Sequence, residues 1–272
     1  MPEGPEIRRQ ADELAEVLNE QYCVGIEFGL PRLHRYSEAL DGVRILKATS
    51  WGKAMLIHFE NGMSIYSHNQ LYGRWWVTKS RRRPETTRQQ RLAVDTRKGS
   101  ALLYSASDIE VMPTAELSSH PFLSRLGPDV LDESTTDSVI EERLTSTEFS
   151  RRQLASLLLD QHFLAGLGNY LRSEILYYAS LMPSRKPSEL SMSEINKLSR
   201  TINAITVRSY KTKGITVPEN VYQALVNQGA GFEQARFAIF NKEGETCLVC
   251  GESIKRENRG GRRIYFCSQC QQ

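Results

Sequence analysis

Several features that would assign a chain to a large class of proteins are missing from this sequence. None of its apolar runs is long enough to span a membrane, and it has no glycine-rich motif of the dinucleotide-binding or P-loop kind. Its start has an acidic, helical pattern rather than that of a signal peptide, so we expect an intracellular protein with no membrane partner. The histidines His58, His68 and His120 lack the spacing of metal ligands.

The net charge is also small, at +3, and does not by itself predict a polyanionic partner. Its distribution is more informative, because basic residues crowd two short stretches. The first stretch contains Lys79, Arg81, Arg82, Arg83, Arg88 and Arg91, and the second contains Lys255, Arg256, Arg259, Arg262 and Arg263. Such clusters suit contact with phosphates, while a solvated loop is the alternative for either one. Two together make a nucleic-acid partner and a pair of solvated loops equally well supported.

The N-terminal half predicts one helix followed by several short strands. Apolar residues from Ile7 to Leu18 recur at helical spacing. The expected strands cover residues 22–28, 43–49, 53–59, 63–68, 74–78, 91–95 and 101–104. The pair Asn61-Gly62 between two of them is typical of a hairpin turn. Strands do not alternate with helices, so the pattern favours a β-sandwich or barrel over a doubly wound parallel sheet.

Three places in this half are candidates for function. Lys53 opens an expected strand, where its amine emerges at a loop–strand junction or simply faces water. The polar loop 67–73 carries Leu71 and Tyr72, which form either a small satellite core or a wedge that enters a partner. Arg125 could hold a phosphate or pin the linker that follows it.

Helical patterns dominate after a polar, turn-rich stretch at residues 127–137, which is the best linker candidate. Helices are expected on both sides of the glycine-bearing turn 160–169 and again at 193–207. The turn ends in Asn169, a good helix N-cap. Backbone amides at this helix start could bind an anion, or the turn could belong to an ordinary helix–turn–helix packing unit.

The strongest local signal comes from four cysteines near the C-terminus. They form two pairs, Cys247 with Cys250 and Cys267 with Cys270, separated by sixteen residues. Two closely spaced pairs of thiolates fit a tetrahedral zinc ion, and four cysteine ligands leave no open position for catalysis. We therefore expect one structural Zn²⁺.

The segment between the two cysteine pairs predicts a β-hairpin that turns at Gly260-Gly261 and presents Arg262 and Arg263 at its tip. A cation on a tip held by a metal is positioned more firmly than one on a mobile loop. The alternative is that the arginines at this tip do no more than clamp a phosphate.

The first residues carry a possible reactive group. Removal of Met1 would leave Pro2 with a free secondary amine, followed at once by the carboxylate of Glu3. A neutral amine of this kind can form an iminium with a sugar aldehyde. The alternative is that Pro5 and Glu6 merely start a helix, and both can hold together. While Met1 is attached, the Pro2 nitrogen is a tertiary amide and cannot attack.

Four motifs in this order resemble one family. These are Met-Pro-Glu-Gly-Pro-Glu at the start, Trp-Gly-Lys-Ala around Lys53, Gly-Leu-Gly-Asn ending at Asn169, and the four-cysteine hairpin with its arginine. Together they are similar to the formamidopyrimidine-DNA glycosylase/endonuclease VIII family. The opening and the stretch Ser-His-Asn-Gln-Leu-Tyr-Gly are most similar to the endonuclease VIII branch.

The resemblance implies an α+β, bilobal DNA-repair enzyme. Its N-terminal catalytic domain would be a β-sandwich flanked by helices, at residues 1–125. A helix–two-turn–helix bundle that binds DNA would follow at 126–222, and a zinc finger at 238–272. The DNA would lie between the lobes. A cytoplasmic monomer acting on damaged double-stranded DNA is expected.

The resemblance also implies roles for particular residues. Pro2 would be the Schiff-base nucleophile, Glu3 the proton donor, and Lys53 would serve base release and β-elimination. Arg262 would serve δ-elimination and phosphate binding. The extruded nucleotide's place would be filled by Gln70, Leu71 and Tyr72, and backbone phosphates would be held by Arg125 and Asn169.

Three points stay open. Arg262 and Arg263 are adjacent, so the choice between them is not fixed. Residues 211–234 are polar with weak periodicity, which predicts a long loop or partly ordered connection. A loop in this region can cover the lesion in the purine-specific branch, so oxidised purines are the alternative to oxidised pyrimidines. A non-catalytic, zinc-containing protein that binds damaged DNA is another alternative.

Overall fold

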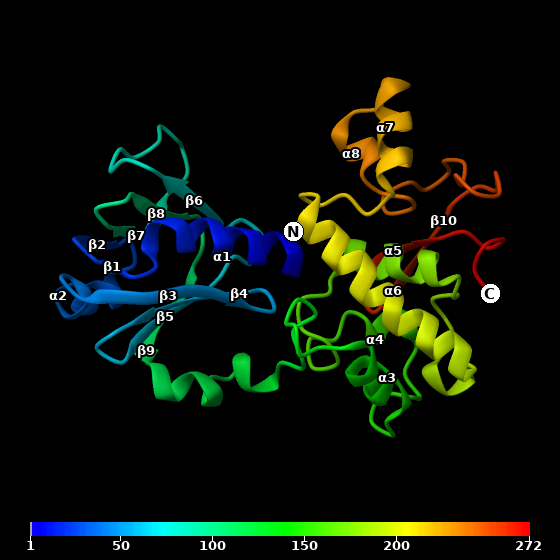
Figure 1. Cartoon of the computed structure of the whole chain (residues 1–272), viewed down its shortest axis with the longest axis horizontal. Helices are drawn as coiled ribbons and strands as arrows, with labels where there is room; N and C mark the ends of the chain where they lie inside the picture. The colour runs from blue at the N-terminus through cyan, green and yellow to red at the C-terminus, as the bar shows by residue number, and fades with distance from the viewer. Residues whose placement is uncertain (1) are drawn as a thin grey trace. The chain divides into compact units, whose positions relative to one another are not determined.

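The computed structural model describes residues 2–272, which divide into two compact units (Figure 1). The first unit contains Pro2 and Glu6–Arg125, and the second contains Glu3–Pro5 and Leu126–Gln272. In the described part of the chain, no helix combines the length and the apolar character that crossing a membrane requires.

The first unit is built from two antiparallel sheets (Figure 1). The five-stranded sheet has the order β1-β3-β4-β5-β9, and the four-stranded sheet has the order β2-β7-β8-β6. The strands are β1 (Gln21–Tyr22), β2 (Gly25–Phe28), β3 (Arg44–Trp51), β4 (Ala54–Phe59), β5 (Met63–His68), β6 (Arg74–Thr78), β7 (Gln90–Asp95), β8 (Ser100–Tyr104) and β9 (Asp108–Pro113). Short helices occupy Pro31–Tyr36, Ser37–Leu40 (α2), Thr114–Ser119 and Leu123–Arg125.

One core joins the two sheets to helix α1 (Gly4–Leu18). The helix buries Ile7, Leu14 and Leu18, as their helical spacing predicts. Alternating strand residues from both sheets, such as Ile57 and Leu103, complete the same core. The sequence-based prediction of a β-sandwich with a leading helix is therefore confirmed.

Two strand predictions need correction. The single strand expected at residues 22–28 is two strands in different sheets. The chain crosses between sheets at Cys23, whose N–H bonds to Val43, while the next N–H, of Val24, bonds to Asp95. Strand β9 was not predicted. The expected turn at Asn61-Gly62 does join β4 to β5.

The second unit is mainly helical. Its helices are α3 (Asp137–Thr145), α4 (Leu154–Leu157), α5 (Asn169–Ala179), α6 (Met192–Lys211), α7 (Glu219–Asn227) and α8 (Phe232–Ala235), with a short 3₁₀ turn at Pro187–Glu189. Helix α5 is buried along almost its whole length, and α6 lies across it. Their apolar faces form one core with residues of the 154–167 segment.

One expectation for this unit needs correction, and another agrees with the structure. The stretch 211–234, predicted as a long loop or partly ordered connection, contains α7 and most of α8. Helix α7 buries none of its residues completely, but Val221 and Tyr222 are partly buried against a core of the second unit. In addition, α3 begins at Asp137, where the predicted linker was expected to end, and Thr136 caps it by accepting from the Val139 N–H.

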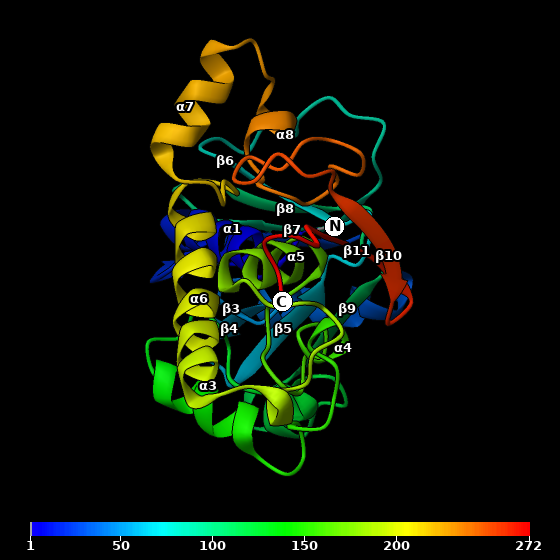
Figure 2. The same ribbon diagram turned by 90° about the vertical axis from the view of Figure 1, so that its right-hand side faces the viewer.

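The predicted hairpin is present as β10 (Lys255–Arg259) and β11 (Arg262–Phe266), which pair antiparallel with Arg259 opposite Arg262. Gly260 and Gly261 form the turn with φ values of 61° and 72°, a region that favours glycine. Strand β11 packs against α5 (Figure 2). The hairpin tip is thus fixed to the most buried helix of the unit.

Candidate functional site

Pro2 lines a hollow in the first unit. The hollow measures about 420 Å³, and its lining also includes Glu6, Arg9, Leu71, Tyr72 and Arg88. Met1, on which the reactivity of the Pro2 nitrogen depends, lies outside the described residues. The candidate nucleophile and the candidate wedge therefore border one space, although Leu71 lies 69 positions after Pro2 in the sequence.

Glu3 groups with the second unit and is buried there, with 4% of its surface exposed. Its Oε1 accepts from the Tyr170 N–H at 2.8 Å, and its Oε2 accepts from the Leu171 N–H at 3.3 Å. These amides belong to the first turn of α5, where the helix dipole favours a negative charge. Of the two alternatives for this turn, an anion site or an ordinary packing unit, the helix start does hold an anion, and it is the chain's own Glu3 carboxylate.

The Gly-Leu-Gly-Asn motif makes this arrangement possible. A Cβ on Gly168 would lie 2.2 Å from Glu3 Cδ, so only glycine leaves room for the carboxylate. The N–H of Gly4 bonds to the carbonyl of Gly166 at 2.8 Å. The predicted N-cap role of Asn169 is wrong, because Gly168 is the N-cap and Asn169 is the first helical residue.

Arg172 connects this helix start to the hairpin. It is completely buried, and its guanidinium donates to Asn169 Oδ1 at 2.6 Å and to the carbonyl of Arg263 at 2.9 Å. Burial lowers the pKa of Arg172 to about 10, the charge of Glu3 opposes this change, and the charge of Arg262 adds to it. Sequence reasoning missed Arg172, although an arginine inside the apolar run 170–179 was a usable signal.

The hairpin tip presents both candidate arginines, since Arg262 and Arg263 are exposed. They differ in their surroundings. Arg262 acts electrostatically on Arg172, while Arg263 offers its carbonyl to the same guanidinium. Of the two tip arginines, Arg262 is the one whose side-chain charge acts on Arg172, as the charge of Glu3 also does, which favours it over its neighbour.

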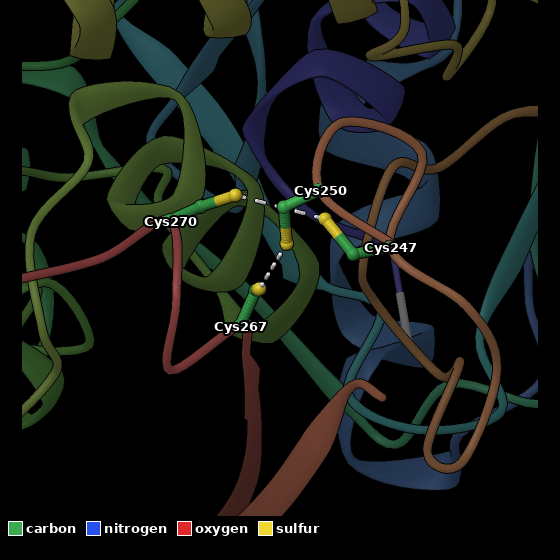
Figure 3. Close-up of side chains that lie close together, drawn as sticks. All are labelled: Cys247, Cys250, Cys267 and Cys270. Atoms are coloured by element: carbon green, nitrogen blue, oxygen red, sulfur yellow. Dashed lines mark hydrogen bonds between the residues drawn. The ribbon is translucent and has the colours of Figure 1, made fainter. Parts of the chain in front are cut away.

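The four cysteines converge on one point (Figure 3). Their sulfurs all lie within 4.8 Å of one another, with Cys247 to Cys270 at 3.8 Å and Cys250 to Cys267 at 3.4 Å. A tetrahedral zinc ion with Zn–S bonds of about 2.3 Å places its sulfurs about 3.8 Å apart. The donor set and the spacing therefore fit zinc, and no other group of this kind occurs among residues 2–272.

Leu71 and Tyr72 project from the loop between β5 and β6, residues 69–73, which we call the wedge loop. They are 55% and 69% exposed. This exposure excludes the alternative of a satellite core and leaves two apolar side chains able to enter a partner. Gln70, just before them, has a positive φ of 51°.

Lys53 and Arg125 lie where the sequence placed them. Lys53 is half-buried in the tight turn from β3 to β4. Burial lowers the pKa of His68, Asp108 opposes this effect, and the nearby charge of Lys53 adds to it. Arg125 is exposed at the end of the 3₁₀ helix that closes the first unit.

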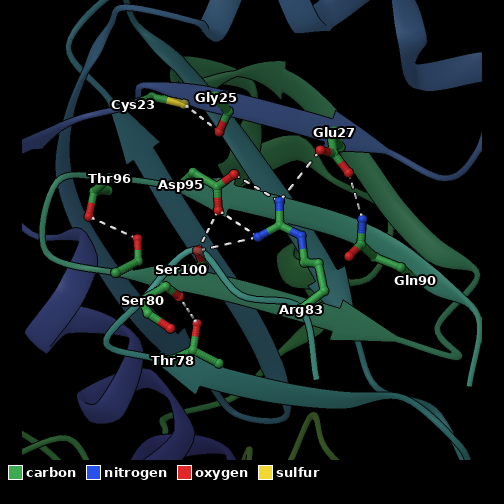
Figure 4. Close-up of polar contacts among 11 residues, drawn as sticks. Cys23, Gly25, Glu27, Thr78, Ser80, Arg83, Gln90, Asp95, Thr96 and Ser100 are labelled. Carbon is green, nitrogen blue, oxygen red and sulfur yellow. Dashed lines mark hydrogen bonds and ion pairs between the residues drawn. The ribbon is translucent and has the colours of Figure 1, made fainter. Parts of the chain in front are cut away.

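Several residues of the two basic stretches are engaged within the protein. Arg83 forms an ion pair with Asp95 at 2.8 Å (Figure 4), and Arg256 and Arg259 pair with Glu243 and Glu257. Lys79, Arg81 and Arg82 are exposed. The number of cations available to phosphates is thus smaller than the sequence suggested.

Two domain families match the chain. Residues 1–107 match the formamidopyrimidine-DNA glycosylase N-terminal domain, and residues 126–220 match the formamidopyrimidine-DNA glycosylase H2TH domain. Curated relatives include Endonuclease 8 from an Escherichia coli strain, which is 45% identical over 271 residues, and Endonuclease 8 from Shigella flexneri, at 44%. Each alignment covers 100% of both chains.

Solved structures agree on the fold. The Lactococcus lactis Fpg (MutM) bound to DNA containing N7-benzyl-Fapy-dG superposes with a TM-score of 0.80 at 24% identity. MutM in complex with DNA containing carbocyclic 8-oxo-G gives the same TM-score at 23% identity. Both matches cover 100% of each chain. At this level of identity the likeness concerns the fold.

Proposed function

The chain belongs to the formamidopyrimidine-DNA glycosylase/endonuclease VIII family, and we propose that it removes oxidised pyrimidines from DNA and cleaves the strand at the resulting abasic site. The full-length similarity to Endonuclease 8 supports placing the chain in the endonuclease VIII branch, for which we expect oxidised pyrimidines as substrates. The observation that carries the proposal is the placement of Glu3. It follows the candidate nucleophile directly, and the first amides of α5 hold its carboxylate in a fixed position.

In the proposed reaction, Pro2 is the nucleophile once Met1 has been removed. An α-amine titrates at roughly 7.7–8.0, so roughly a tenth or more is neutral near physiological pH. The neutral nitrogen attacks C1′ of the damaged nucleotide, the glycosidic bond breaks and the base leaves with its electron pair. Opening of the sugar ring then gives an iminium between Pro2 and C1′.

Glu3 would exchange the proton that ring opening requires. Hydrogen bonds from two backbone amides favour the ionised carboxylate. As a carboxylate, Glu3 can accept a proton from the attacking amine and deliver it to the sugar ring oxygen. Glu3 alone, the residue that follows the nucleophile, would therefore carry out both proton transfers.

Strand cleavage would follow by elimination. The iminium makes the C2′ proton acidic, and its removal expels the 3′ phosphate in β-elimination. A second elimination expels the 5′ phosphate, and the iminium is hydrolysed to free Pro2. We assign Lys53 to base release and β-elimination, and Arg262 to δ-elimination and to phosphate binding.

Binding would use the wedge loop and backbone phosphate contacts. Extruding a nucleotide costs a few kcal/mol, and this cost is least for a damaged base. Leu71 and Tyr72 would occupy the vacated space with Gln70, and Arg125 and Asn169 would hold phosphates. We infer that one copy of the chain is sufficient for these contacts.

The four cysteines would hold one zinc ion. Its contribution is structural, because thiolates fill all four positions of a tetrahedral site. Bound there, it would fix the segments on either side of β10 and β11 and thereby the arginine tip. No step of the reaction passes through it.

Borohydride trapping tests the proposal. Damaged duplex and abasic duplex should each give a covalent adduct with protein whose Met1 is shown by intact mass to be absent. Pro2→Gly should slow base release. Absence of an adduct with verified Pro2 at the terminus contradicts the mechanism. A panel of lesions in one duplex context tests the substrate, since faster excision of oxidised purines than pyrimidines contradicts the choice of pyrimidines.

A further inference from the structure

The wedge loop presents two apolar side chains that its own fold does not bury. Leu71 and Tyr72 are mostly exposed, so their burial contributes little to holding the loop in one conformation. A loop of this kind requires hydrogen bonds from its neighbours if its side chains are to point in a fixed direction.

The first half of the loop is held from within the five-stranded sheet. His68 Nδ1, at the end of β5, accepts from the Gln70 N–H at 3.0 Å, and Ser107 Oγ, just before β9, donates to Gln70 Oε1 at 3.1 Å. The loop closes on itself through the Gly73 N–H and the Asn69 carbonyl, 2.7 Å apart. A Cβ on Gly73 would lie 2.5 Å from that carbonyl oxygen, so this turn needs glycine.

The second half of the loop is contacted by a different part of the chain. Arg88 Nη1 donates to the carbonyl oxygen of Tyr72 at 2.8 Å. Arg88 belongs to the segment that joins β6 to β7, residues 79–89, which has no regular secondary structure. It also lines the hollow that Pro2 borders. One guanidinium therefore connects this segment, the backbone of the wedge loop and the candidate nucleophile's surroundings.

The 79–89 segment is itself anchored on both sides of Arg88. Upstream, Arg83 donates two hydrogen bonds to Asp95, at 2.8 Å each, and Asp95 also accepts from Ser100 (Figure 4). Burial opposes the charge of Asp95, but the hydrogen bonds from Arg83 and Ser100 hold its pKa below the usual range. Downstream, the Ser105 N–H bonds to the Gln89 carbonyl at 2.9 Å.

We propose that Arg88 is a positioning residue that fixes the Tyr72 carbonyl and so holds Leu71 and Tyr72 in the orientation needed to replace an extruded nucleotide. The expected effect of Arg88 on base excision rests on the proposed function. Without this hydrogen bond the Tyr72–Gly73 peptide can reorient, and the loop must be ordered each time a nucleotide leaves the stack. Excision from paired DNA should then slow, while chemistry on a nucleotide that needs no replacement should not.

The test compares Arg88→Ala with Arg97→Ala, which removes the same charge from an exposed turn between β7 and β8. On duplex with one oxidised pyrimidine, Arg88→Ala should lower the single-turnover excision rate by roughly tenfold, as expected for a hydrogen bond from a charged donor. Borohydride trapping on a single-stranded abasic site should stay within about twofold of the unmodified protein. Arg97→Ala should leave both rates unchanged.

A double-mutant cycle separates positioning from phosphate binding. In protein that carries Leu71→Ala and Tyr72→Ala, the wedge is gone and adding Arg88→Ala should have no further effect. If Arg88→Ala costs the same factor in that background, the arginine acts on DNA directly and the positioning role is wrong.

Hydrogen exchange of the DNA-free protein decides the structural claim by itself. Arg88→Ala should speed exchange of the Gly73 amide and Arg97→Ala should not. Unchanged exchange at Gly73 overturns the proposal. If Arg88→Ala speeds this exchange but the unmodified protein traps no DNA, the proposed function is contradicted and the structural claim is not. The two failures are therefore distinguishable.

Discussion

The carboxylate of Glu3 caps helix α5 by accepting the Tyr170 N–H at 2.8 Å. A residue at the start of the chain thus satisfies a helix that begins at residue 169, and the helix in turn fixes the residue next to Pro2. This capping is an electrostatic match, because the positive end of the helix dipole faces a buried negative charge. It also explains why the turn before α5 contains glycine at position 168.

Glu3→Gln should separate the two proposed activities. The amide keeps one oxygen for the helix amides but cannot exchange a proton at the sugar ring. We expect base excision to fall by roughly 10²-fold or more, within the range for loss of a general acid–base group. Nicking of preformed abasic sites should fall much less. Parallel assays of excision and nicking with one preparation test this, and an equal loss of both contradicts the assigned role.

Gly168→Ala should disturb Glu3 without touching its chemistry. The new Cβ would lie 2.2 Å from Glu3 Cδ, so the carboxylate or the turn must move. We expect a loss of about 1–3 kcal/mol in the free energy of unfolding, typical of overpacking, and slower excision. Gly231→Ala is the matched control, because a Cβ there meets only Gln234 Oε1, at 3.8 Å. Thermal unfolding of the two variants and single-turnover excision provide the comparison.

Much of this arrangement could be read from local sequence patterns. Three elements follow from the spacing of residues that are close together in the sequence. They are the hairpin between the cysteine pairs, the turn at Asn61-Gly62 and helix α1. The exposure of Leu71 and Tyr72 was one of two alternatives that the pattern left open.

The contacts that assemble the candidate site could not be read in this way. Glu3 accepts hydrogen bonds from α5, while Arg172 donates to the hairpin and Arg88 donates to Tyr72; each of these bonds joins residues that are far apart in the sequence. Nothing in the local spacing indicates which carboxylate meets which amide. Helix α7 was not predicted although its apolar residues do recur at helical spacing, so this miss was an error in interpreting the pattern and not a lack of signal.

Removal of the metal should loosen the hairpin. A four-cysteine zinc site can contribute roughly 10–16 kcal/mol of apparent binding energy to a small module. Cys250→Ser should therefore lower the zinc content below one ion per chain, increase proteolysis after residue 240 and weaken binding of abasic duplex. Cys23→Ala is the control, because Cys23 is buried in the first unit and is not a member of the cluster. Elemental analysis of both variants tests the assignment, and full zinc in Cys250→Ser contradicts it.

The His68–Gln70 hydrogen bond predicts an acid-sensitive wedge loop. His68 Nδ1 accepts from the Gln70 N–H, so the bond requires a neutral ring at that nitrogen. Burial lowers the pKa of His68 below its ordinary value of 6.5, Asp108 opposes the shift, and Lys53 adds to it. A group whose pKa is lowered by folding contributes stability that is present above the unfolded pKa. That stability falls as the pH drops below about 6.5, because the unfolded chain binds the proton first.

His68→Asn tests this prediction, because the asparagine Oδ1 can accept the same hydrogen bond without titrating. Protonation of the Pro2 amine slows both proteins equally as the pH falls, so the informative quantity is the ratio of their excision rates on duplex. We expect the unmodified protein to lose several-fold more activity than His68→Asn between pH 7 and pH 5.5, corresponding to roughly 1 kcal/mol. On single-stranded abasic DNA the ratio should stay constant. A constant ratio on duplex as well would show that the wedge loop does not depend on the neutral form of His68.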